Sequence, residues 1–133
     1  MVERKWGRII SIASSGVIQP IRELALSNTL RSEIVNWNKS LANEIAPWGV
    51  TVNTLIPGRI HTERVDEIDQ IRADKAHRHV NDIISESCAA IPMNRYGTVK
   101  EIASTAVFLA SRQAAYITGS CIRVDGGLIS SVF

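Results

Sequence analysis

The sequence predicts an α/β fold built on a small parallel sheet. Three short segments, at 7–13, 50–56 and 120–124, are rich in apolar and β-branched residues, which is typical of strands in a parallel sheet. Amphipathic segments separate them, which predicts a βαβ unit with a right-handed crossover. Three strands make a small parallel sheet, so residues 1–133 are predicted to form a single partial domain, one half of a doubly wound sheet.

The first predicted strand reads GRIISIA and is expected to be buried on both faces. The next element is a helix over 27–46, in which apolar residues recur at intervals of three or four positions. One stripe consists of Leu30, Ile34, Trp37, Leu41 and Ile45, and a second stripe beside it of Val35, Ala42 and Ala46. So wide an apolar face predicts packing on the sheet and on another helix. Ser27 or Asn28 is expected to cap the start of this helix.

The second strand, VTVNTLI at 50–56, is followed by a turn at 57–58. The polar stretch from 62 to 92 has apolar residues near one face, which predicts one or two amphipathic helices. Because the stretch is long and polar, we expect these helices to lie over the body of the protein as a lid.

A third helix follows the lid, and its start carries a recognisable signal. Thr98 and Glu101 have the spacing of a capping box, and apolar residues continue from Val99 at helical intervals. The last predicted strand, at 120–124, ends at Asp125-Gly126-Gly127.

The composition is that of a globular protein without an obvious macromolecular ligand. Hydrophobic residues make up 45% and charged residues 21% of the chain, which excludes a disordered protein. A formal net charge of +2 gives no electrostatic reason to expect nucleic acid or a membrane surface as a partner. No segment is long and apolar enough to predict a transmembrane helix. Cys88 and Cys121 match no zinc or redox spacing, so we expect no metal site and a reducing, cytoplasmic location.

Three loops should meet at one edge of the predicted sheet. Ligands of open α/β sheets bind beyond the carboxyl ends of the strands, where Ser14-Ser15-Gly16, the 57–62 loop and the 125–127 turn are expected. Small hydroxyl residues and glycine let a ligand approach the backbone closely. Ordinary turn chemistry explains the same residues equally well, so position alone leaves the two interpretations open.

Three longer segments resemble the carboxy-terminal half of short-chain dehydrogenases/reductases. They are GRIISIASS at 7–15, SLANEIAPWGVTVNTLIPGRIHT at 40–62 and NRYGTVKEIASTAVFLASRQAAYITGSCIRVDGG at 94–127. In style they are similar to the bacterial 3-oxoacyl-carrier-protein reductases. The resemblance implies a Rossmann-like fold, NAD or NADP as cofactor, a small carbonyl or alcohol substrate and a homo-oligomer, either a dimer or a tetramer.

The resemblance also assigns roles to individual residues. Ser14 falls on the family's catalytic serine, which hydrogen-bonds the substrate oxygen. Four residues match the family's Pro-Gly-x-x-x-Thr stretch, which contacts the nicotinamide carboxamide and the phosphates. They are Pro57, Gly58, Ile60 and Thr62.

The family's central Tyr-x-x-x-Lys pair is replaced. An ungapped match places Ser27 and Arg31 at these positions, and a slipped match places Leu24 and Asn28 there. An aliphatic hydroxyl is a far weaker acid than a phenol, so Ser27 cannot take over the proton transfer of the tyrosine. Arg31 keeps a positive charge and is predicted to hydrogen-bond the ribose, with a geometry different from that of lysine.

The glycine-rich phosphate-binding motif is absent from the whole chain. We therefore expect residues 1–133 to be a fragment of a longer chain, inactive alone and without a bound dinucleotide. The first hypothesis is an NAD(P)-dependent oxidoreductase as parent chain, with catalytic roles for Ser14, Ser27 and Arg31. The second is a catalytically inactive scaffold that mediates interaction or oligomerisation through its helices.

Other polar residues carry weaker hypotheses. His77 and His79 are two positions apart and should point to different faces of a helix, which favours solvated side chains over a metal site. Arg59 and Arg64 flank the Pro-Gly turn and are expected to form salt bridges. Tyr96 is a weak candidate for the missing proton donor.

Overall fold

The strands of the sheet run side by side in the order β1-β2-β3, and both pairs are parallel. The computed structural model describes residues 1–132, with β1 at Gly7–Ile12, β2 at Val50–Pro57 and β3 at Cys121–Val124. Gly7 lies opposite Val50, and Thr54 lies opposite Cys121. The predicted three-stranded parallel sheet, the half of a doubly wound fold, is therefore confirmed.

The central strand β2 carries the core, because both of its neighbours cover it. Seven consecutive residues of β2, from Val50 to Ile56, are buried. Successive side chains of a strand point to opposite faces, so Leu55 and Ile56 enter two different apolar clusters. The expectation that the first strand is buried on both faces was wrong. β1 pairs along one edge only, and Ile12 is exposed.

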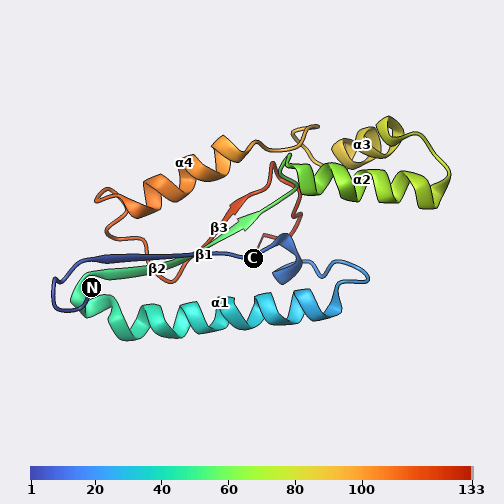
Figure 1. The fold of residues 1–133 in the computed structure, drawn as a ribbon. Coiled ribbons are helices and arrows are strands. Elements are labelled where there is room, and N and C mark those ends of the chain that lie inside the picture. The colour runs from blue at the N-terminus through green and yellow to red at the C-terminus, as the bar shows by residue number, and fades with distance from the viewer. Residues whose placement is uncertain (133) are drawn as a thin grey trace.

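Helices cover both faces of the sheet (Figure 1). α1, Ala25–Ile45, lies along one face, and α4, Val99–Ala110, lies across the other. α2, Glu63–Ala76, and α3, Val80–Ala89, pack against each other beyond one end of the sheet.

The start of α1 differs from the prediction. The helix begins at Ala25, and its N-cap residue Leu24 offers no side-chain hydrogen bond. Ser27 and Asn28 lie inside the first turns, so neither is the cap. The Asn28 side-chain amide instead donates to the Ile21 carbonyl at 2.9 Å and holds the preceding loop against the helix.

The apolar face of α1 also packs differently from the prediction. Leu30, Ile34 and Trp37 of the first stripe are 57%, 44% and 56% exposed. The sheet is covered by the second stripe, where Ala42 is buried beside the buried Asn38. The Asn38 amide donates to the Thr54 hydroxyl at 2.8 Å. Helical periodicity identified both stripes, but it could not tell which of them faces the sheet.

The capping box of α4 is present as predicted. The Thr98 hydroxyl accepts the Glu101 amide, and the Glu101 carboxylate accepts the Thr98 amide at 2.7 Å. This reciprocal pair satisfies two amides that the first turn of a helix leaves unpaired. Within residues 1–132 no helix is long and apolar enough to cross a membrane.

Candidate functional site

The loops that follow all three strands meet at the carboxyl edge of the sheet. The loops after β1 and β2 line one cavity of about 620 Å³, together with residues that follow the 125–127 turn. Helices α2 and α3 close the cavity from above, and they contribute Arg72, Glu86 and Ser87. The predicted crevice is thus an actual cavity, roofed by the stretch that the sequence indicated as a lid.

Ser14 stands at the mouth of this cavity, directly after β1. Its backbone is extended, and its hydroxyl oxygen accepts the Gly16 amide at 3.2 Å, which caps the short 3-10 helix Ser15–Val17. A serine hydroxyl that accepts one hydrogen bond keeps its own proton as a donor. Ser14 is half-buried, so this proton can be offered to an oxygen atom in the cavity.

Ser27 and Arg31 lie one turn apart on α1 and contact each other. The Arg31 Nε donates to the Ser27 hydroxyl at 3.3 Å, and the other end of the guanidinium donates to the Ala13 carbonyl at 3.3 Å. Arg31 therefore lies beside the residue that precedes Ser14. Neither Ser27 nor Arg31 is among the described residues that line the cavity.

The Pro-Gly loop is fixed by contacts within the protein. The Gly58 amide donates to the Val124 carbonyl at 3.0 Å, and a Cβ at position 58 would lie 2.7 Å from the Asp125 Cα. The sequence predicted that glycine here would let a ligand approach. The structure shows that the Asp125 backbone makes the close approach. Gly58 is required because the loops after β2 and β3 touch.

The remaining loop residues lie between β2 and α2. Ile60 forms a parallel bridge with Gly97, which ties the loop to the segment before α4. Thr62 is the exposed N-cap residue of α2, and its hydroxyl makes no capping bond. The side chain of Thr62 is thus available at the start of the helix.

A buried ionic cluster beneath the lid was missed by the sequence reasoning. The Asp69 carboxylate is fully buried, bonded to the Arg59 guanidinium and to the Tyr96 hydroxyl at 2.8 Å. The same guanidinium lies over the Tyr96 ring, 5.2 Å from its centroid. The expected salt bridge of Arg59 is therefore present, but it is buried rather than superficial. A signal existed: Asp69 stands four positions from Val65 and from Ala73 on the packed face of α2.

Tyr96 is not placed to replace the missing proton donor. Burial raises the pKa of Tyr96 above its usual value, so the phenol is neutral at neutral pH. Its proton is donated to Asp69, and among the described residues it does not line the cavity that contains Ser14.

The histidines are accounted for by local contacts. His79 is the N-cap residue of α3 and accepts the Asn81 amide, while His77 adopts a left-handed conformation at the end of α2. His61 lies 3.0 Å from Asp66 on the surface. Over residues 1–132 no three histidine, cysteine or acidic side chains gather as a metal site would require.

A parallel sheet covered by helices on both faces, with a cavity at the carboxyl ends of its strands, defines the Rossmann-like class of nucleotide-dependent proteins. Residues 1–129 match the family model described as enoyl-(acyl carrier protein) reductase. The chain therefore belongs to the short-chain dehydrogenase/reductase family.

Curated relatives match nearly the whole chain. The 3-oxoacyl-[acyl-carrier-protein] reductase FabG of Buchnera aphidicola subsp. Baizongia pistaciae (strain Bp) is 38% identical over 130 residues, which is 96% of this chain and 48% of the relative. The NADPH-dependent reductase BacG of Bacillus subtilis (strain 168) is 33% identical over 132 residues, 99% of this chain and 51% of the relative. The chain thus spans about half the length of the curated relatives it matches.

Solved structures agree on the fold. YwfH, an NADPH dependent reductase involved in bacilysin biosynthesis, superposes with a TM-score of 0.92 and 32% identity over 98% of this chain and 50% of its own. An actinorhodin polyketide ketoreductase with NADPH has a TM-score of 0.90 and 30% identity over 96% of this chain and 49% of its own.

Proposed function

We propose that this chain forms the substrate-side half of an NAD(P)-dependent oxidoreductase acting on a small carbonyl or alcohol compound. The observation that carries the proposal is the position of Ser14. Its hydroxyl lines a cavity at the carboxyl edge of a Rossmann-like sheet, at the position where the family has its substrate-binding serine. In this role Ser14 donates its proton to the substrate oxygen and orients the carbonyl carbon toward the cofactor.

The residues present fit one end of a nicotinamide cofactor. Pro57, Gly58, Ile60 and Thr62 form the loop that would hold the nicotinamide, and the exposed Thr62 hydroxyl is available to a phosphate oxygen. Arg31 would hydrogen-bond the ribose. When bound, the cofactor supplies the hydride. The adenosine end has no glycine-rich loop in this sequence, so its binding site must come from outside residues 1–133.

Ser27 and Arg31 give this site an unusual proton relay. A serine hydroxyl does not exchange a proton near neutral pH, so the proton of the reaction must come from water or from a residue outside this chain. The Arg31 guanidinium, held by Ser27 and the Ala13 carbonyl, supplies a fixed positive charge beside Ser14. We expect catalysis to be slower than in relatives with the tyrosine, by about 10²- to 10⁴-fold.

The test is a cofactor titration of the complete polypeptide in which this chain occurs. Nicotinamide fluorescence should show saturable binding of NADH or NADPH, and oxidation of the reduced cofactor should depend on an added carbonyl compound. Ser14→Ala should lower the rate at least about 100-fold while cofactor affinity stays unchanged, because only the substrate oxygen loses a contact. Ser15→Ala, on the same cavity, is the matched control. Absence of both cofactor binding and turnover would refute the proposal.

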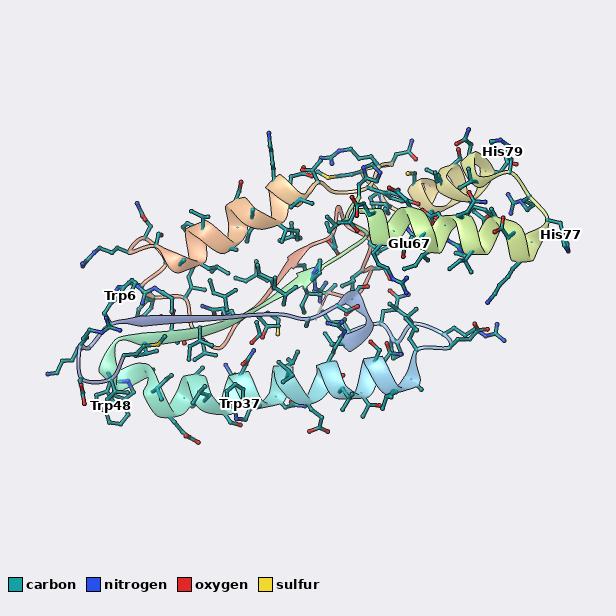
Figure 2. The ribbon with its side chains drawn as sticks, viewed as in Figure 1. Trp6, Trp37, Trp48, Glu67, His77 and His79 are labelled. Carbon is teal, nitrogen blue, oxygen red and sulfur yellow. The ribbon has the colours of Figure 1, made fainter. Side chains whose placement is uncertain are left out.

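A second function, that of a non-catalytic scaffold, is favoured by one observation. The first stripe of α1 presents Leu30, Ile34 and Trp37 to solvent. Figure 2 shows Trp37 projecting from the side of α1 that faces away from the sheet. Such a surface suits self-association as a dimer or tetramer, and this proposal holds with or without turnover. A cytoplasmic location remains a prediction from the sequence.

A further inference from the structure

The cavity that contains Ser14 is positively charged on its lid side. Arg59 and Arg72 both line it, Arg59 from the loop after β2 and Arg72 from α2. The cavity volume, about 620 Å³, is in the range of pockets that bind small organic molecules. The cavity therefore combines a hydroxyl donor on one side with two guanidiniums on the other.

A single carboxylate serves both guanidiniums. Asp69 is bonded directly to Arg59, and its Oδ1 lies 3.7 Å from the Arg72 guanidinium. The third acidic or basic residue on the cavity wall, Glu86, forms a 2.7 Å ion pair with Arg78 and so is already compensated. The charges of this wall consequently sum to an excess of one positive charge.

The excess charge resides on Arg72. Arg59 is three-quarters buried and is held by Asp69 and by the Tyr96 ring. The Arg72 side chain is 43% exposed, and one of its five N–H groups donates to the Ser87 hydroxyl at 2.9 Å. The planar fork of a guanidinium matches a carboxylate in a bidentate arrangement.

We propose that Arg72 binds a carboxylate of the substrate, so that the compound bound in this cavity is an oxo acid or the corresponding hydroxy acid. The inference rests on the proposed function and adds the substrate class to it. Ser14 takes the carbonyl oxygen, and Arg72 takes the carboxylate at the other side of the same cavity. One excess positive charge beside the compensated Glu86 suits a monoanion better than a phosphate dianion.

The test compares acids with their methyl esters in the complete polypeptide. Isothermal titration calorimetry would measure the binding of pyruvate and acetoacetate, each against its methyl ester, with inorganic phosphate as a further ligand. At least one acid should bind about tenfold or more tightly than its ester, which corresponds to one charge-assisted hydrogen-bond pair. Arg72→Gln should reduce this preference to about twofold or less. Arg64→Gln is the matched control, because Arg64 lies on the same helix and pairs with Glu67 on the surface.

Each outcome decides the inference. Equal binding of acids and esters, no binding of either, tighter binding of phosphate, or an unchanged preference in Arg72→Gln would overturn it. Oxidation of NADPH measured on the same samples reports the proposed function separately. Turnover at equal kcat/KM for acid and ester would support the reductase and refute the acid site. A carboxylate preference without any turnover would do the reverse.

Discussion

The buried Asp69 joins three parts of the chain at a single carboxylate. It connects α2 to Arg59 after β2 and to Tyr96 before α4. We predict that Asp69→Asn lowers the free energy of unfolding by about 3 kcal/mol, because Arg59 is left partly buried without a counter-charge. Urea denaturation followed by circular dichroism would measure the loss.

Asp66→Asn is the matched control for this prediction. Asp66 lies on the same helix and contacts His61, with both side chains more than half exposed. Surface pairs of this kind contribute about 0–1 kcal/mol, so the control should stay close to the wild type. A similar, small effect of both substitutions would show that the buried cluster does not hold the lid.

At the scale of single residues, the sequence predicted positions better than contacts. Ser14 lines a cavity at the strand ends, as its place after an apolar strand required. The role of Gly58 was wrong, because the Asp125 backbone that approaches it is 67 positions away in the chain. The importance of Asp69 was missed for the same reason, since its partners belong to distant segments.

The capping box is the clearest stability determinant at the scale of one element. Thr98→Ala removes a hydroxyl that accepts the Glu101 amide, and we predict a loss of about 1 kcal/mol in the free energy of unfolding. Ser104→Ala is the control, because Ser104 is exposed within the same helix and caps nothing. An equal effect of the two substitutions in thermal or urea unfolding would contradict the prediction.

The same element predicts a pH dependence. Hydrogen bonds from Arg95 and from Thr98 lower the pKa of Glu101 from 4.5 to about 2. A carboxyl whose pKa is lower in the folded state stabilises the fold above its unfolded pKa, and this contribution disappears as pH falls from 4.5 towards 2. The difference in stability between the wild type and Glu101→Gln should therefore be largest at neutral pH and shrink below 4.5. A difference that stays constant over this range in urea titrations would refute the linkage.

At the scale of the whole molecule, alternation of strands and amphipathic helices was sufficient to predict the parallel sheet and its layers. A buried strand such as β2 must be apolar on both faces, and the sequence displays this directly. The partner of each helix stripe could not be predicted. Periodicity defines a face, whereas the order of strands and the chain's neighbours decide what that face contacts.

The outward stripe of α1 gives the last prediction, which concerns assembly. Exposed large apolar side chains on one helix face are costly in water unless another surface covers them. We predict that the protein self-associates through Leu30, Ile34 and Trp37. Ile34→Lys combined with Trp37→Lys should shift the sedimentation coefficient toward that of the monomer and leave the helical circular dichroism signal unchanged, because neither side chain packs on the sheet. Asn43→Lys adds a charge to the same helix outside the stripe and should leave association intact. A wild-type protein that sediments as a monomer at all concentrations would exclude this interface.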